Sequence, residues 1–428
     1  MRRSSLLISA LLVAALSIGA RAQTRTRPRE PTRLGFAPER LARIDRFLQE
    51  AVDSSRIAGA VALVMRDGQV VYERSVGWSD RETGRRMPPD AVFRIASQTK
   101  AVTSTAILML VEEGKITLTD PVSRFIPTFA TTTVASRIDT GRTVVRAKRA
   151  ITIKDLLTHT SGISYGTDAA VASRYSPVGL GPAAGFGWYT ADKDEPICRT
   201  MERLGSVPFV SQPGEAWVYG YSTDVLGCVV ERASGIPLDE FVRTRITAPL
   251  GMNDTWFFLP PAQRARLATV YASDTMGHYF RAPDGPRGQG DYVTGPRRSF
   301  SGGAGLLSTA HDYARFLEML LEGGTLDGVR ILSPKTVAVM TSNQIGGVYG
   351  QEGLGFGLGF QIVERTGALG LASVGSFGWG GAYGSTYLVD PAERLVILFM
   401  IQQIPNRTDV AYKFPTLVYQ ALVEPKRP

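Results

Sequence analysis

The chain has 428 residues, of which 44% are hydrophobic, and its formal net charge is +9. This composition excludes a disordered or fibrous chain and predicts one large globular domain or two smaller ones. The basic residues are dispersed and no aromatic-basic motif accompanies them, so we expect a solvated basic surface and no nucleic-acid partner.

The N-terminus has the order of features found in a secretory signal. Arg2 and Arg3 precede an apolar run over 6–20, and an Ala-Arg-Ala cleavage site follows. Residues 1–22 are therefore predicted to be a signal peptide, and 23–35 a disordered leader rich in arginine and proline. The arginine pair leaves Sec and twin-arginine export both open. No later run is apolar enough to span a membrane, so we expect an exported protein, periplasmic or secreted, with no stable membrane anchor.

Residues 36–114 and 297–428 are predicted to form one domain around a β-sheet. The first part has the apolar spacing of a helix over 38–52, and two strands follow over 60–65 and 69–77. An Asp-Gly pair joins these strands, which is a strong signal for a two-residue hairpin.

The second part of this domain returns to strands after a capped helix over 309–321. Strands are predicted over 354–363, 384–389 and 395–402, and an amphipathic helix over 409–423 follows them. Because strands lie near both ends of the sequence, we expect the two termini to build one sheet.

Residues 115–296 are predicted to form an inserted domain of short helices and loops. A capping box begins a short helix over 152–159, and a longer helix covers 222–233. The stretch 164–211 is long for a structureless loop and is expected to form a lid or a pocket wall.

The chain contains two cysteines, Cys198 and Cys228. They could form a disulfide in an exported protein, although Cys228 also fits a small core position, so their pairing stays open. Neither has the spacing of a metal ligand, and no cofactor or metal is expected.

The most informative motif is Ser97-Gln98-Thr99-Lys100, which precedes an apolar segment with no charge until Glu112. Such a helix is a buried one, and residues three apart share a face, so the Ser97 hydroxyl and the Lys100 amine can meet. Burial and the positive end of the helix both disfavour an ammonium, and a neutral lysine can activate a serine as nucleophile. The tetrapeptide alone fits an N-cap serine with a snorkelling lysine better.

Further segments change that interpretation. Tyr219 lies in the sequence PGEAWVYGY before the 222–233 helix, and Trp379-Gly380-Gly381-Ala382 enters a predicted strand. With FRIAS ending at Ser97, LLTHTSG at 156–162 and GGAGL at 302–306, the chain resembles the serine hydrolases of the class C β-lactamase and penicillin-recognising superfamily. The likeness is greatest to their carboxylesterase branch, the family VIII esterases, and extends from about Phe36 to Leu422.

The resemblance implies an α+β, β-lactamase/transpeptidase-like fold, in which an antiparallel sheet flanked by helices and built from both termini carries an inserted, mostly helical domain. It implies that Ser97 attacks an acyl carbonyl to form an acyl-enzyme, with Lys100 and Tyr219 as general base and acid. The backbone N–H groups of Ser97 and Ala382 would form the oxyanion hole.

The chain departs from the superfamily at two places. Tyr219-Gly220-Tyr221 lacks the asparagine of the Y-x-N motif, and Tyr221 becomes a rival for the tyrosine role and a candidate pocket residue. Trp379, Gly380 and Gly381 stand where penicillin-recognising enzymes have K-T-G, whose lysine attracts a substrate carboxylate. An indole offers an apolar wall and one N–H donor instead. The expected small-molecule substrates are therefore uncharged, short-chain carboxylic esters.

Two other functions stay open from the sequence: a β-lactamase or D-amino-acid peptidase acting on cell-wall-like amides, and a non-catalytic protein that binds a ligand or assembles. The oligomeric state is undetermined as well.

A second serine and three histidines are rival candidates for the nucleophile and the base. Ser164 lies in a G-x-S-x-G sequence typical of α/β-hydrolases, but this sequence follows a helix and not a strand, which disfavours Ser164 as nucleophile. His159, His278 and His311 are not well placed for a Ser-His-Asp triad, so lysine and tyrosine are expected to carry the base role.

Overall fold

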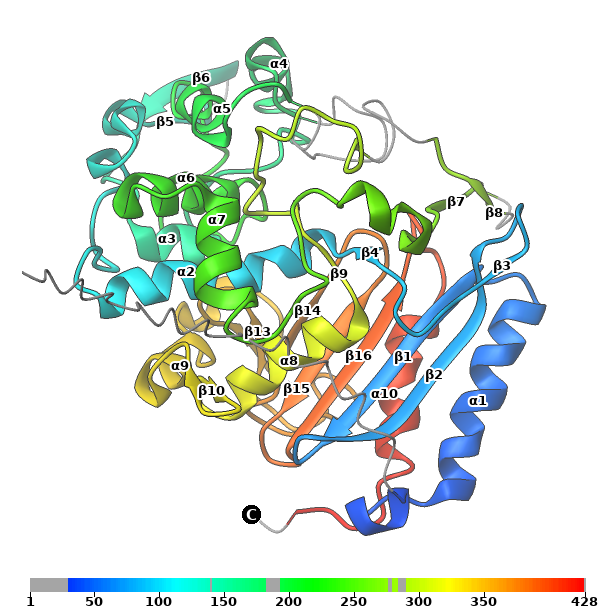
Figure 1. The fold of residues 1–428 in the computed structure, drawn as a ribbon. Helices are drawn as coiled ribbons and strands as arrows, with labels where there is room; N and C mark the ends of the chain where they lie inside the picture. Colours follow the sequence, from blue (N-terminus) through cyan, green and yellow to red (C-terminus); the bar gives the residue numbers. More distant parts are fainter. Residues whose placement is uncertain (1–29, 139–140, 182–192, 276–278, 284–289, 427–428) are drawn as a thin grey trace, which may run out of the picture.

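The computed structural model describes residues 30–138, 141–181, 193–275, 279–283 and 290–426. Its centre is an antiparallel sheet of eight strands in the order β12-β13-β14-β15-β16-β1-β2-β3 (Figure 1). The strands are β1 Gly59–Arg66, β2 Gln69–Asp80, β3 Arg85–Arg86, β12 Leu354–Phe356, β13 Gln361–Val363, β14 Phe377–Gly380, β15 Thr386–Asp390 and β16 Leu395–Ile401.

The two ends of the chain meet in the middle of this sheet. β1 pairs with β16 from Ala60↔Ile401 to Arg66↔Leu395, and β16 is buried along its whole length. Apolar residues on both faces of these strands bury the sheet between two layers of helices. The prediction of an antiparallel sheet built from both termini and flanked by helices is thereby confirmed.

Each face of the sheet has its own apolar core, because side chains alternate along each strand. Ala62 and Phe399 belong to the core under α1 and α10, whereas Leu63 and Leu398 belong to the core that contains α2 and α8. The helices are α1 Pro38–Asp53, α2 Thr99–Glu112, α3 Ile153–Leu157, α4 Ala172–Tyr175, α5 Ile197–Leu204, α6 Ser222–Ser234, α7 Leu238–Val242, α8 Ala310–Leu321, α9 Pro334–Met340 and α10 Val410–Tyr419.

The segment between α2 and α8 carries the short helices α3 to α7. Among the described residues, two-stranded pairs that the sequence did not predict lie within this segment, across its two ends and after α8. The two-stranded pairs are β4 Phe93–Arg94 with β9 Leu307–Ser308, β5 Thr133–Ile138 with β6 Gly141–Arg146, β7 Tyr271–Ser273 with β8 Tyr279–Arg281, and β10 Thr325–Leu326 with β11 Val329–Arg330. The sequence of β5 and β6 is rich in Thr and Val, which is typical of strands.

Several expectations need adjustment. The single strand predicted over 354–363 is two strands, since Gly359, with φ of +105°, lies in the turn between β12 and β13. Residues 31–34 of the predicted leader form a 3-10 turn, and Arg66 binds the carbonyl of Leu34. The predicted signal peptide and His278 lie outside the described residues. No helix in the described ranges is long and apolar enough to cross a membrane.

The question of the two cysteines has an answer in the structure. Cys198 and Cys228 form a disulfide that joins α5 to α6. The cross-link fixes α6, the helix that follows Tyr219 in the sequence.

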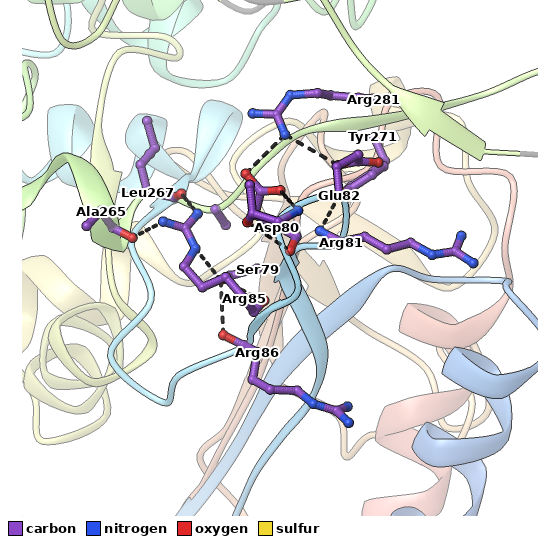
Figure 2. Close-up of polar contacts among 12 residues, drawn as sticks. Ser79, Asp80, Arg81, Glu82, Arg85, Arg86, Ala265, Leu267, Tyr271 and Arg281 are labelled. Carbon is purple, nitrogen blue, oxygen red and sulfur yellow. Dashed lines mark hydrogen bonds and ion pairs between the residues drawn. The ribbon is translucent and has the colours of Figure 1, made fainter.

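Arginines tie residues 265–281 to the edge of the sheet (Figure 2). Arg85 donates from Nε to Ser79 Oγ at 2.9 Å and from a terminal nitrogen to the Leu267 carbonyl at 3.0 Å, and it also binds the Ala265 carbonyl. Arg281 pairs with Asp80 at 3.0 Å. A cavity of about 800 Å³ opens beside these contacts, and the charged side chains lining it are Asp80, Arg85, Arg94, Arg264, Arg281 and Asp291.

Candidate active site

Ser97 lies in a tight turn immediately before the buried helix α2. Ala96, with φ of +46°, reverses the chain direction there, a strained conformation for a residue with a Cβ. From Thr99 to Leu110 every residue of α2 is buried, as the absence of a charged face indicated. The core therefore holds this turn in place and directs Ser97 into a cavity.

The Lys100 amine lies among three oxygen atoms. Its Nζ donates to the Gly303 carbonyl at 2.8 Å, to the Tyr165 hydroxyl at 2.9 Å and to Ser97 Oγ at 3.2 Å. The side chain is buried. The i, i+3 spacing thus brings the predicted nucleophile and base into direct contact, as expected for residues on one helical face.

Asp224 holds the loop that supplies the Gly303 carbonyl. The buried carboxylate accepts from Ser301 Oγ and from the Gly303 N–H, the latter at 3.2 Å. Burial raises the pKa of Asp224, while the Lys100 charge and these two hydrogen bonds oppose the rise. Since a Cβ at Gly303 would lie 2.4 Å from Asp224 Oδ2, only glycine lets the loop approach the carboxylate.

Tyr165 is a site residue that the sequence analysis missed. Its hydroxyl binds Lys100, and its side chain lines the same cavity as Ser97. Burial first, then its neighbours Tyr219, Asp224 and Tyr221, hold the pKa of Tyr165 well above its usual value, while a bond to Ser97 opposes this. Tyr165 follows Ser164 in the G-x-S-x-G sequence at 162–166, and only the serine of that sequence was considered as a candidate.

Tyr219 also contacts the lysine, and its ring lies next to that of Tyr165. Its ring centroid is 4.6 Å from Lys100 Nζ, which is a cation–π contact. Its hydroxyl accepts a hydrogen bond of 3.1 Å from Trp379 Nε1. The indole N–H that the sequence analysis offered to a substrate therefore orients Tyr219.

Gly220, the middle residue of the segment that matches Y-x-N, lies against a neighbouring loop, and Tyr221 stands at the position of the asparagine. A Cβ at Gly220 would lie 2.3 Å from the Ile163 carbonyl oxygen, so no larger residue fits there. This close approach places Tyr219 beside the loop that carries Tyr165, and the two rings meet edge to face at 5.7 Å.

The interpretation of Tyr221 as a pocket residue was wrong. The side chain is buried behind the site, where its hydroxyl accepts from the Gly181 N–H at 3.2 Å, and it is not among the described residues lining the cavity. Its ring packs edge to face on Tyr165 at 4.9 Å. Tyr221 therefore supports Tyr165 and does not face a substrate.

Ser164, His159 and His311 are not among the described residues that line the cavity at Ser97, and His278 lies outside the described residues. Ser164 is buried and accepts from the Gly166 N–H at 3.0 Å. The His159 ring packs 4.7 Å from the ring of Tyr219, and burial, followed by the Lys100 charge, lowers its pKa well below the usual value, so this histidine is neutral. His311 pairs with Glu73 at 2.8 Å.

The cavity in front of Ser97 has a volume of about 720 Å³. Its wall includes Trp379, Gly380, Gly381 and Ala382, so the segment predicted for the pocket and for one oxyanion donor lies beside Ser97. Trp379 and Gly380 end β14 and do not begin it. Among the described residues that line the cavity none is an arginine or a lysine. The described parts of the chain hold no group of three or more His, Cys, Asp and Glu residues suited to a metal ion.

Comparison with known proteins identifies the family of this chain. The sequence model of the Beta-lactamase family matches residues 44–420. The chain belongs to the β-lactamase family. Esterase EstB of Burkholderia gladioli is 36% identical over 376 residues, which cover 84% of this chain and 89% of EstB. A putative D-alanyl-D-alanine carboxypeptidase of Escherichia coli K12 is 27% identical, with 94% of this chain and 90% of that protein covered.

A solved structure supports the same assignment. EstCE1, described as a hydrolase with promiscuous acyltransferase activity, superposes with a TM-score of 0.73 at 27% identity over 90% of this chain and 98% of its own. The chain is thus a β-lactamase-like serine hydrolase, and its relatives within the β-lactamase family include esterases.

Proposed function

We propose that this serine hydrolase cleaves uncharged carboxylic esters, short-chain esters among them, through an acyl-enzyme on Ser97. One observation carries the proposal. The Ser97–Lys100 pair opens on a largely apolar cavity in which the described lining residues include no arginine or lysine to attract a substrate carboxylate. A β-lactam or a peptide C-terminus would place its carboxylate there without a cationic partner, at a cost of about 1–3 kcal/mol or more.

Acylation begins from the neutral amine of Lys100, which accepts the Ser97 proton across the 3.2 Å contact, so that in this step the Ser97 hydroxyl donates to Nζ. The serine oxygen then attacks the ester carbonyl carbon, and the carbonyl oxygen becomes the oxyanion of a tetrahedral intermediate. The N–H groups of Ser97 and Ala382 are proposed to bind this oxyanion, because both residues line the cavity at the point of attack.

Collapse of the intermediate breaks the bond to the alcohol oxygen, which must receive a proton. The Lys100 ammonium, hydrogen-bonded to Tyr165, is proposed as its source, with the hydroxyl of Tyr219 on the side of the leaving alcohol. Trp379 donates to this hydroxyl, which leaves the proton of Tyr219 available for a bond to the alcohol oxygen. Water then attacks the acyl carbonyl carbon while Lys100 takes a proton from it. The bond between that carbon and Ser97 Oγ breaks, Oγ receives the proton back from Lys100, and the carboxylic acid leaves.

Export from the cytoplasm is part of the proposal. The Cys198–Cys228 disulfide supports it, since disulfides persist in oxidising compartments and are rare in the cytosol. Mass mapping of the N-terminus of the protein recovered from the periplasm or medium tests it, with cleavage after Ala22 expected.

The nearest alternative is cleavage of D-alanyl peptides or β-lactams. The likeness to the putative D-alanyl-D-alanine carboxypeptidase favours it. Trp379 argues against it, because the indole takes the place of the lysine that would bind the terminal carboxylate.

The deciding experiment compares p-nitrophenyl acetate, nitrocefin and a D-Ala-D-Ala peptide on the purified enzyme. We expect kcat/KM for the ester to exceed both others by at least about a hundredfold. Ser97→Ala should abolish ester hydrolysis and labelling by a fluorophosphonate, whereas the matched control Ser164→Ala should keep most of it. Equal turnover of nitrocefin and the ester would instead establish the alternative.

A single substitution tests the reason for this selectivity. Trp379→Lys should raise kcat/KM for nitrocefin by about tenfold and lower that for the ester, because it adds a cation and removes the indole. Trp379→Phe is the control, since it keeps the apolar wall without adding charge. A similar gain for nitrocefin in the Phe variant would show that the missing cation is not what excludes β-lactams.

A further inference from the structure

The catalytic cavity continues past strand β14 to the other face of the sheet. Phe377 and Trp379 of β14 face the core that contains α2. Side chains alternate along a strand, so Gly378 and Gly380 face α10, and as glycines they leave that face of β14 bare. The same cavity that contains Ser97 is lined there by Leu388 of the sheet and by residues of α10.

A passage joins the two sides because β13 is short. β13 begins at Gln361, which pairs with Gly378, so Trp379 and Gly380 extend beyond the end of β13. The cavity can therefore run from Ser97 around this edge of β14.

The far end of the cavity, which we call the outer groove, is formed by Gly378, Gly380, Leu371, Tyr412 and Thr416. Its mouth is unusually apolar for a surface, since Leu371 is 57% and Tyr412 77% exposed. Single exposed apolar side chains are common on protein surfaces, whereas a cluster of them at an opening indicates a binding site.

We propose that the outer groove binds the acyl chain of the substrate, so that the enzyme accepts esters of medium-length aliphatic acids, of about eight to ten carbons, in addition to short ones. A cavity of about 720 Å³ falls in the range of sites for drug-sized ligands, far more than an acetyl group fills. This inference rests on the proposed ester hydrolysis.

The position of the proton donors assigns the groove to the acyl chain and not to the alcohol. The alcohol oxygen needs a proton from the Lys100, Tyr165 and Tyr219 cluster, which lies on the Trp379 side of β14. The outer groove lies on the opposite side, beyond Gly380. When the acyl chain occupies the groove, the alcohol group of the ester lies beside Tyr165 and Tyr219.

The test fills the groove from α10. Thr416 is exposed and lines the groove, so Thr416→Trp should block it without disturbing the core. Lys413→Trp is the matched control, because Lys413 is exposed on the same helix and is not among the described lining residues. The substrates are p-nitrophenyl acetate and p-nitrophenyl decanoate below micellar concentration, together with ethyl and decyl acetate.

Thr416→Trp should lower kcat/KM for the decanoate by about tenfold or more, since the chain loses apolar contact, and leave p-nitrophenyl acetate within about twofold. The ratio of decyl to ethyl acetate should not change, and Lys413→Trp should behave as the native enzyme. Leu371→Asp, at the mouth, should repeat the loss for the decanoate.

Two results would overturn the inference. An unchanged decanoate-to-acetate ratio in both groove variants would show that the groove holds no part of the substrate, and a loss confined to decyl acetate would assign it to the alcohol. Failure of the proposed function is a separate result, because it appears as an absence of p-nitrophenyl acetate hydrolysis by the native enzyme.

Discussion

We compare two cavities of similar size among the described residues, each with cations in or beside its wall. The arginine-lined cavity beside β3 has a volume of about 800 Å³, and the cavity at Ser97 about 720 Å³. In the first, Arg85 donates to two backbone carbonyls and to Ser79 (Figure 2). In the second, two of the three acceptors of Lys100 are the hydroxyls of Ser97 and Tyr165.

The difference lies in what the acceptors can do. A backbone carbonyl has no proton to transfer, and a guanidinium does not give one up, so the contacts of Arg85 can only hold two segments together. An amine next to two hydroxyls can exchange protons with both. The volume of a cavity and the number of cations around it do not identify the reactive site. The hydroxyl groups bound to Lys100 identify it.

The strongest test of this comparison converts the cation of the active site into that of the other cavity. Lys100→Arg puts a guanidinium in place of the amine, and a guanidinium cannot accept the Ser97 proton. We expect kcat/KM for p-nitrophenyl acetate to fall by about a thousandfold or more, as far as in Lys100→Ala. An active Lys100→Arg enzyme would remove lysine from the base role.

The hydroxyl partners come next in expected effect. Tyr165→Phe removes the hydroxyl bound to Lys100, and Tyr219→Phe removes the one bound to Trp379. Each should lower kcat by about a hundredfold, within the range of general acid–base catalysis. Tyr221→Phe is the control and should stay within about threefold. A strong loss of activity in Tyr221→Phe, together with an active Tyr165→Phe enzyme, would make Tyr221 again the candidate for the catalytic tyrosine.

Substitutions in the arginine-lined cavity should change the stability of the protein and not its catalytic activity. Arg85→Ala breaks three hydrogen bonds of a charged donor and should lower the free energy of unfolding by about 2 kcal/mol, with activity per folded molecule within twofold. Arg264, exposed in the same cavity, gives the control, and Arg264→Ala should change stability by less than about 0.5 kcal/mol. Denaturant unfolding and ester hydrolysis, measured together, separate the two effects. Loss of activity at unchanged stability in Arg85→Ala would contradict the comparison.

A third titratable side chain, a buried carboxyl, has neither kind of partner. Glu318 on α8 is buried, and its Oε1 atom has no hydrogen-bond partner among the described residues. Burial first, and the charges of Glu322 and Asp327 after it, raise the pKa of Glu318 from 4.5 to about 7, although Arg315 and Arg394 oppose this. The folded state therefore keeps a proton that the unfolded state loses between these two values.

This carboxyl should make stability depend on pH. Its contribution is fully present below about pH 4.5 and is lost as pH rises to about 7. Glu318→Gln should remove that dependence and raise the free energy of unfolding at pH 8, relative to the native protein, by about 1–3 kcal/mol more than it does at pH 4.5. Unfolding in urea at both pH values measures the difference. An equal effect of the substitution at both would show that the pKa of Glu318 is the same in the folded and the unfolded protein.

The sequence predicted those features that rest on local periodicity. Apolar spacing predicted α1, a run without charges predicted α2 and a cap predicted α8, each to within a few residues. The i, i+3 spacing predicted the contact of Ser97 with Lys100. Their geometry depends on residues close together in the chain, where spacing determines which side chains meet.

The remainder of the site depends on contacts between distant segments. Tyr165 reaches Lys100 only because Gly220 lets the Tyr219 segment approach the 163–165 loop. The same approach turns Tyr221 away from the cavity, which spacing along the chain could not show. The Trp379 contact with Tyr219 joins a strand to a loop 160 positions away, and no local pattern records it.

The pairing of β1 with β16 also bears on how the polypeptide emerges from the ribosome. Met65 and Val396 are neighbours in the sheet, so the centre of the sheet has to wait until nearly the whole chain has been synthesised. At about 5–20 residues per second this delay lasts on the order of tens of seconds. During that time β1, whose side chains are mostly apolar, lacks the partner strand on one of its two edges. A nascent chain with this topology is expected to need a chaperone that holds its N-terminal strands, because exposed strand edges are prone to aggregate.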